Sequence, residues 1–239
     1  MSHARATTPA LPAVFVPGLA GHASEFEALA RLWTHGPVLC LEPAVTGDLS
    51  IAGQAHRVAE TVRDAGLDAY VVVGHSQGGL VALELAVTRP AEVVAVAVLD
   101  APVLVPRPLR AALRGFAALL GTPLGPLLLR AFFRATFVEA DRPENRAAVL
   151  ARLAGVPTPV ARRIVGAAFG YDGARALALL DVPATIVRAN IPTRLDRLPS
   201  TVRGREITGA GHWIHVHRPQ EVAALLDELT AAVAVVGDR

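Results

Sequence analysis

The amino-acid sequence predicts an α/β fold, with a mostly parallel sheet covered by helices on both faces and a helical lid inserted after the strand that ends at Asp100. Three observations lead to this class. Short β-branched runs alternate with helical stretches in the first part of the chain, which is typical of a parallel sheet. Residues 74–78 form a G-x-S-x-G motif between one such run and a helical stretch. Residues 103–180 then show helical stretches alone, so we expect 1–102 and 181–239 to form the core and 103–180 the lid.

The core elements follow from apolar runs and from helix start signals. Residues 70–73 are entirely apolar and rich in valine, which suits a strand buried on both faces of a parallel sheet. Ser50 suits the N-cap of the next helix, and Pro219 suits the first turn of the closing helix. The expected strands are 13–16, 38–41, 70–73, 93–99, 184–187 and 205–208. The expected core helices are 25–33, 51–65, the stretch after the motif, and 219–236.

The lid is expected to consist of amphipathic or apolar helices separated by proline and glycine. These helices are rich in leucine, alanine and phenylalanine, so they are expected to line an apolar cleft over the core. Apolar helices of this kind also pack on one another, and that arrangement accounts for many of the same residues. The expected helices are 109–120, 127–137, 143–153 and 158–169.

Composition limits the classes of protein to consider. Apolar residues make up 52% of the chain and charged residues 18%, which is enough to fill a large core. The net charge is only +2 and no basic run stands out, so nucleic-acid binding is not favoured. The single cysteine, Cys40, excludes an intramolecular disulfide and is interpreted as a buried strand residue. We find neither a signal peptide nor an apolar run long enough to span a membrane, and we expect a cytoplasmic protein.

Ser76 stands at the centre of the G-x-S-x-G motif. A strand, a sharp turn and a helix are the context that makes this motif a nucleophile elbow. The turn requires small residues two positions before and after the serine, and it raises the hydroxyl above the sheet. The following N–H, that of Gln77, then points into the same space. The alternative interpretation is a glycine-rich turn in which Ser76 caps the helix.

Four segments resemble the α/β-hydrolase superfamily, over nearly the whole chain. They are VFVPGLAG near the start, GHSQGG around Ser76, VLDAP after the next strand, and GAGHWIHVHRPQEV near the end. The resemblance implies that Ser76 is the nucleophile and that His212, in the turn after the last strand, is its base. It also implies an oxyanion hole formed by the backbone N–H groups of Leu19 and Gln77.

Two other interpretations concern the histidines of the last segment. His212 could be a structural turn residue instead of a base. His215 and His217 follow closely, but no carboxylate or thiolate cluster accompanies them in the sequence, so a zinc site is not favoured.

The acid that would orient His212 has two candidates. Many family members carry it in the loop after the strand that matches 184–187, but the matching position falls near Pro192, where no carboxylate occurs. Asp196 lies a few residues later, between two arginines, and is equally compatible with a surface ion pair. Asp100, at the carboxyl end of the strand after the elbow, is the favoured acid, because some lactonases and dehalogenases of this superfamily carry theirs there.

The function predicted from these residues is cofactor-free hydrolysis of an ester or lactone of a medium-sized hydrophobic substrate, through an acyl-enzyme on Ser76. No cofactor, metal, nucleic acid or membrane span is implied, and the sequence does not indicate an oligomeric state. Two alternatives stay open, because one fold hosts many chemistries. The same triad could serve cofactor-independent oxygenation, C–C cleavage or a lyase reaction, or the protein could be a non-catalytic receptor.

Overall fold

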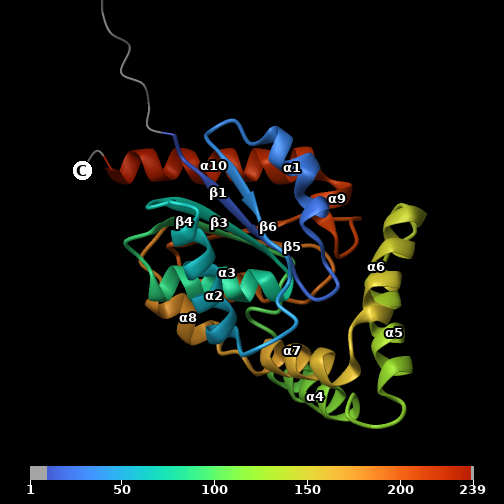
Figure 1. The fold of residues 1–239 in the computed structure, drawn as a ribbon. Coiled ribbons are helices and arrows are strands. Elements are labelled where there is room, and N and C mark those ends of the chain that lie inside the picture. Colours follow the sequence, from blue (N-terminus) through green and yellow to red (C-terminus); the bar gives the residue numbers. More distant parts are fainter. Residues whose placement is uncertain (1–9, 238–239) are drawn as a thin grey trace, which may run out of the picture.

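The computed structural model describes residues 10–237, which form a single parallel sheet with helices on both faces (Figure 1). The six strands lie in the order β2-β1-β3-β4-β5-β6, and every neighbouring pair is parallel. Their carboxyl ends therefore all lie along the same edge. The strands are β1 (Ala13–Val16), β2 (Val38–Cys40), β3 (Tyr70–His75), β4 (Val93–Leu99), β5 (Ala184–Arg188) and β6 (Val202–Glu206).

Two hydrophobic clusters hold helices against the two faces of this sheet. Successive strand residues point to opposite faces, so Val72 packs in one cluster while Val71 and Val73 pack in the other. Figure 1 shows α1 and α10 on one side of the sheet and α2, α3 and α8 on the other. These helices are α1 (Glu27–Leu32), α2 (Ile51–Asp64), α3 (Gln77–Thr88), α8 (Gly173–Leu179) and α10 (Pro219–Gly237). A turn of 3-10 helix, η1 (Ala23–Phe26), precedes α1, and the short α9 (Ile214–His217) precedes α10.

The chain between β4 and β5 contains five helices. Four of them lie beyond the carboxyl ends of the strands and enclose a third hydrophobic cluster, which Trp213 of the core joins. The fifth, α8, packs against α3 beside the sheet. The four are α4 (Arg107–Leu119), α5 (Gly125–Ala135), α6 (Pro143–Gly155) and α7 (Thr158–Gly170).

Several predicted elements are confirmed, and others differ. The β1 and β4 boundaries are as predicted, and Ser50 caps α2 by accepting a hydrogen bond from Gly53 N at 3.0 Å. The last strand, β6, begins three residues earlier than expected, because backbone pairing with β5 defines it and its sequence is rich in arginine and glycine. Strand β2 is an edge strand, so Cys40 is only partly buried. The helix α8 was not predicted.

No helix within residues 10–237 is long and apolar enough to cross a lipid bilayer.

Candidate active site

Ser76 lies on a strained turn between β3 and α3. Its backbone has φ 55° and ψ −126°, a conformation that residues with a side chain rarely adopt. The neighbouring backbone leaves no room for side chains, since a Cβ on Gly74 would lie 2.1 Å from the Gly78 carbonyl oxygen. The Ser76 side chain makes no capping hydrogen bond to α3. Ser76 thus occupies the N-cap position of α3 without capping it through its side chain, and the turn leaves the hydroxyl available to the cavity.

Asp100 and His212 form a buried hydrogen-bonded pair. The distance from His212 Nδ1 to Asp100 Oδ2 is 2.7 Å, and the two residues are 6% and 0% exposed. The Asp100 carboxylate also accepts three backbone N–H groups from the loop after β5. These are the amides of Ala189, Asn190 and Ile191, at 2.7, 3.0 and 3.0 Å from Oδ1.

Asp196 lies elsewhere, on the surface of the protein. Its carboxylate pairs with Arg194 at 2.5 Å and lies 3.8 Å from Arg197. The hydrogen bond from Arg194 lowers the pKa of Asp196 to about 2. Of the two candidate acids, the structure brings Asp100 to His212 and leaves Asp196 in a surface ion pair.

The turn that carries His212 is held from two sides. Its own backbone N–H donates to the Thr136 carbonyl at 3.1 Å, and its carbonyl accepts from His75 Nε2 at 2.9 Å. Burial keeps the pKa of His75 well below its usual value, so this ring stays neutral and can donate from Nε2 while the other nitrogen carries no proton.

The remaining histidines of the last segment pack against other side chains. His215 is fully buried and its ring lies 4.4 Å from both Phe26 and His75. Burial lowers the pKa of His215 to about 3. His217 Nε2 lies 3.4 Å from the buried Asp141 carboxylate. Within residues 10–237 no group of three or more His, Cys, Asp or Glu side chains is placed to hold a metal ion.

Leu19 and Gln77 both lie beside Ser76. Gln77 is the first residue of α3, so its amide has no acceptor one turn earlier in the helix. Among the described residues, the Leu19 amide likewise has no intramolecular acceptor. The Gln77 side chain donates from Nε2 to Gln54 Oε1.

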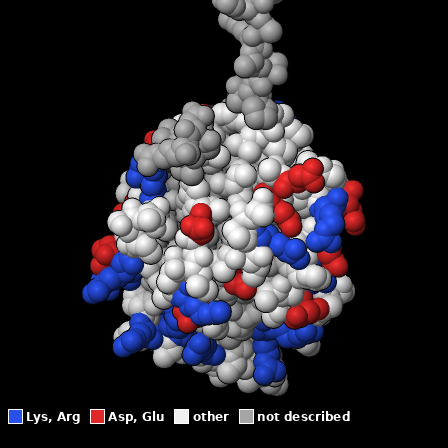
Figure 2. Space-filling view, turned by 90° about the vertical axis from the view of Figure 1, so that its left-hand side faces the viewer, with Lys and Arg blue, Asp and Glu red and all other residues white. Residues whose placement is uncertain are grey.

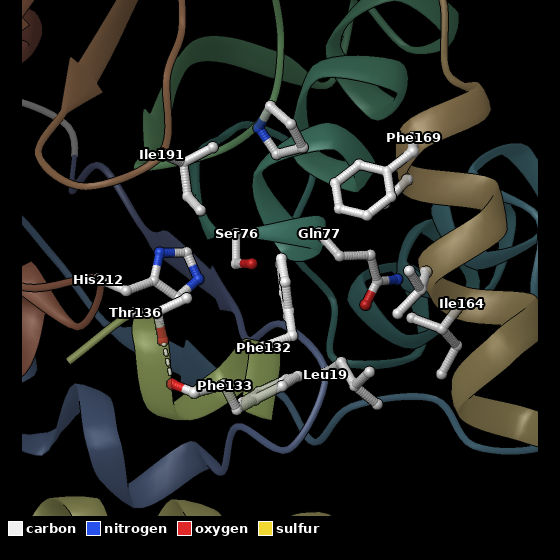
Figure 3. A pocket seen from close by; sticks show the side chains of 13 residues that line it. Leu19, Ser76, Gln77, Phe132, Phe133, Thr136, Ile164, Phe169, Ile191 and His212 are labelled. Carbon is white, nitrogen blue, oxygen red and sulfur yellow. Dashed lines mark hydrogen bonds between the residues drawn. The ribbon is translucent and has the colours of Figure 1, made fainter. Parts of the chain in front are cut away.

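A cavity of about 50 Å³ lies over Ser76 and His212. In Figure 3 the His212 imidazole lies beside Ser76, and Phe132, Phe133, Ile164 and Phe169 surround the opposite side. The Ser76 hydroxyl points away from the His212 ring, and no hydrogen bond joins the two side chains in this part of the structure. Besides His212, the cavity wall carries no ionisable side chain. Its lining residues are Leu19, Ser76, Gln77, Pro102, Phe132, Phe133, Thr136, Ile164, Val165, Ala168, Phe169, Ile191 and His212.

Comparison with known proteins shows the family to which the chain belongs. Residues 13–225 match the sequence profile of the alpha/beta hydrolase family, which is most of the chain. The chain belongs to the alpha/beta hydrolase family. It is therefore a hydrolase, and the resemblance seen in its sequence motifs is confirmed.

Three proteins illustrate what this hydrolase is similar to. Over 89 residues it is 36% identical to RutD of Escherichia coli O103:H2, a protein with an inferred assignment as a carbamate hydrolase. That match spans 34% of each chain, so it covers about a third of the relative. A thermophilic esterase from Thermogutta terrifontis superposes with a TM-score of 0.73 at 18% identity, over 93% of this chain and 90% of the other. An enol-lactonase from Burkholderia xenovorans LB400 superposes with a TM-score of 0.75 at 18% sequence identity, over 95% of this chain and 94% of the other. These two structures share the fold.

Sequence reasoning missed several residues that build the site of this hydrolase. The amides of residues 189–191 hold Asp100, and the Thr136 carbonyl holds the His212 turn. Backbone groups of this kind leave no signal in residue type. The sequence shows that His75 belongs to the G-x-S-x-G motif and Phe132 to a predicted lid helix. It does not show which residues these two side chains contact, because those contacts form only when the chain folds.

Proposed function

We propose that this hydrolase cleaves an ester or lactone of a hydrophobic, uncharged substrate through an acyl-enzyme on Ser76. One observation carries the proposal. Ser76 and His212, which is hydrogen-bonded to the buried Asp100 carboxylate, line the same cavity. Among the described residues, no other ionisable side chain lines that cavity. Serine, histidine and carboxylate in this relation are the parts needed for nucleophilic acyl transfer.

The proposed reaction begins with a rotation of Ser76 about its Cα–Cβ bond, which brings the hydroxyl to His212 Nε2. Catalytic hydrogen bonds are often absent or long before substrate binds. His212 then accepts the proton as Oγ attacks the carbonyl carbon, and the N–H groups of Leu19 and Gln77 stabilise the oxyanion. The imidazolium returns its proton to the leaving oxygen. Water, activated by the same ring, releases the acid, while Asp100 keeps Nδ1 protonated throughout.

The lining of the cavity supports an apolar acyl group. Phenylalanine and aliphatic side chains from α5 and α7 face Ser76, and no charged group is available there to bind a charged substrate. The cavity has a volume of about 50 Å³. Each additional buried methylene is worth about 0.8 kcal/mol, so kcat/KM should rise gradually with acyl length until the cavity is full.

The test is labelling of the intact protein with a fluorophosphonate, followed by mapping of the modified peptide. We expect one label on Ser76, none in Ser76→Ala, and hydrolysis of p-nitrophenyl esters that depends on the same residue. A panel of esters, lactones and carbamates then ranks substrates by kcat/KM. Labelling that survives in Ser76→Ala would reject the nucleophile. A labelled protein with no hydrolysis of any panel member would favour the receptor or the non-hydrolytic alternatives.

A further inference from the structure

The charge of this protein is divided unequally between the insertion and the core. Residues 103–180 contain eleven arginines and four acidic residues, whereas the rest of the chain contains twelve arginines and seventeen acidic residues. From residue 101 to 138 there are five arginines and no acidic residue at all. Figure 2 shows the left-hand face of Figure 1, away from α5 and α6, and on that face arginines and acidic side chains are interspersed. The insertion is therefore strongly cationic, although the net charge of the whole chain is only +2.

Exposed leucines occur at one end of this insertion. Leu119, Leu124 and Leu127 are 52%, 61% and 67% exposed, and they lie at the end of α4, in the turn that follows it and in the first turn of α5. They are half of the six large hydrophobic residues that the described structure leaves exposed. Figure 1 shows this turn, the α4–α5 tip (residues 119–127), projecting away from the sheet at the lower right. Single exposed leucines are common, but three in one projecting turn form a patch.

Arginines flank the α4–α5 tip. A hollow on the outside of α4 and α7 is lined by Arg114, Arg162 and Arg163. Arg162 reaches the tip itself, since its Nη1 lies 3.1 Å from the position of a Cβ on Gly121. Within residues 10–237, none of these three guanidinium groups has a carboxylate oxygen within 4 Å. Arg114 and Arg163 each donate one hydrogen bond to a carbonyl oxygen, that of Gly170 at 3.4 Å and that of Gly47 at 3.2 Å, so their guanidinium groups keep further N–H donors for an external anion.

A second hollow lies on the other side of the tip, between α5 and α6. Its walls are mostly apolar, and Arg130 lies among them. The tip thus combines projecting leucines, an apolar hollow and arginines without carboxylate partners.

We propose that the α4–α5 tip docks this protein on the surface of an anionic phospholipid membrane. Leucines of the tip would enter the interface between headgroups and acyl chains, while Arg114, Arg162 and Arg163 bind lipid phosphates, for which the planar guanidinium is well suited. Charge argues against a second copy of the chain as the occupant, because two cationic insertions would repel one another. The proposal is independent of the proposed function, since it concerns binding and not turnover.

Docking at this tip also places the cavity favourably for an apolar substrate. Phe132 on α5 and Phe169 on α7 line the cavity, and both helices run from the tip region toward Ser76.

The test is flotation of the full-length protein with vesicles of phosphatidylcholine containing a quarter phosphatidylglycerol, compared with vesicles of phosphatidylcholine alone. We expect binding to the anionic vesicles at low ionic strength, at least tenfold weaker binding to the neutral ones, and weakening by salt. The triple variants Leu119→Ser/Leu124→Ser/Leu127→Ser and Arg114→Gln/Arg162→Gln/Arg163→Gln should each lose at least tenfold in partitioning.

Two control variants make the result specific. Leu179→Ser removes an exposed leucine on α8, and Arg31→Gln/Arg63→Gln/Arg197→Gln lowers the net charge by the same amount at exposed sites outside the insertion. Both should bind as the unchanged protein does. The proposal is overturned if no vesicle binds, or if control and tip variants lose binding equally. It is also overturned if sedimentation without lipid shows a dimer that the leucine variant abolishes, because a second copy then covers the tip.

Discussion

Asp100 carries its carboxylate in a place that water does not reach. The residue is 0% exposed and has a positive φ of 46°, a strained backbone that packing must maintain. An ionised carboxylate is costly to bury unless hydrogen bonds replace its water. Here the amides of residues 189–191 donate hydrogen bonds to Asp100 Oδ1, and His212 Nδ1 lies within hydrogen-bond distance of Oδ2. The loop that supplies the acid in many family members here supplies the donors that hold one.

Exchange of Asp100 for asparagine should impair catalysis without unfolding the protein. The three amides would hold the asparagine Oδ1, so its NH₂ would face His212 Nδ1 and force the proton onto Nε2, where it blocks acceptance from Ser76. We expect Asp100→Asn to lower kcat by roughly 10²–10⁴-fold. Steady-state kinetics on the best ester, with circular dichroism to confirm folding, measures the loss.

Asp196→Asn is the matched control for that experiment. Its carboxylate is exposed and pairs only with surface arginines, so kcat should change by less than about tenfold, equivalent to roughly 1.4 kcal/mol. A large loss in Asp196→Asn and none in Asp100→Asn would transfer the role of the acid to Asp196. Small losses in both would leave Ser76 and His212 as a dyad.

Glu25 makes stability depend on pH. Its carboxylate is buried, pairs with Arg152 of α6 and accepts the His22 amide, yet burial outweighs these contacts and raises its pKa from 4.5 to about 7. Between these values the folded state binds more protons than the unfolded state, so the free energy of unfolding falls as pH rises. The stabilisation is fully present below pH 4.5 and lost as pH rises through about 7. A pKa shift of this size corresponds to a change of roughly 3 kcal/mol in the free energy of unfolding between low and high pH.

Replacing Glu25 by glutamine removes this titration. We expect the free energy of unfolding of Glu25→Gln, relative to that of the unchanged protein, to increase as pH rises from 5 to 8, because only the unchanged protein loses stability over this range. Urea denaturation at both values measures the difference, and Glu27→Gln, an exposed neighbour on α1, is the control. A difference that stays constant with pH, or that changes in the opposite sense, would show that Glu25 ionises normally in the folded protein.

The loop between α5 and α6 supports the turn that carries His212. Asp141 in this loop is buried, accepts the Val138 amide at 2.9 Å and lies 3.4 Å from His217 Nε2. A Cβ on Gly211 would meet Asp141 Oδ2 at 2.2 Å, so the two segments are in direct contact. The insertion thus holds the His212 turn as well as lining the cavity.

Gly211→Ala should therefore act on catalysis through position. The new methyl group must displace Asp141 or the His212 turn, and we expect kcat to fall by at least tenfold while KM changes less. Gly209→Asn is the control, because Gly209 has φ 69° and open space around it, a conformation that asparagine tolerates. The double variant Gly211→Ala/Asp141→Ala should recover part of the lost kcat by making room. If it loses as much as the sum of the single variants, the contact with Asp141 is not the cause.

The helices and strands show where sequence patterns are informative. Val93–Leu99 is a long β-branched run, and it forms β4 with the boundaries that the pattern predicts. Helix α8 has only seven residues and was missed, although Asp172 caps it by accepting the Arg175 amide. Strand β6 was misplaced because its Val202–Glu206 sequence lacks a β-branched run and owes its conformation to pairing with β5. Local patterns identify elements that are long and apolar, and tertiary pairing decides the rest.

For the molecule as a whole, the motif order was enough to place the main site residues together. Ser76 and Asp100 end neighbouring parallel strands, and such ends meet at one edge of a sheet. The sequence could not show that the insertion is attached to the core at several points. Arg152 of α6 donates to the Ala20 carbonyl at 2.8 Å and pairs with Glu25, and Tyr171 donates to Glu84 at 2.9 Å. Each of these contacts joins residues that are far apart in the chain, so a local sequence pattern does not indicate them.

The attachments imply that the insertion and the core unfold together, and the two tryptophans can test this. Trp213 is 1% exposed and stacks on Phe137 at the boundary with the insertion, with ring centroids 4.6 Å apart. Trp33 lies in the core at the end of α1 and donates to the Leu11 carbonyl at 3.2 Å. Trp33→Phe leaves the probe at the boundary, and Trp213→Phe leaves the probe in the core. Each variant's fluorescence transition in urea should coincide with its own far-UV circular dichroism transition, as two-state unfolding requires.

If Trp213 fluorescence changes at lower urea than the circular dichroism of the same variant, the insertion separates from the core first. In that case the contacts of Arg152, Thr136 and Asp141 do not couple the two parts, and the insertion can open as an independent lid.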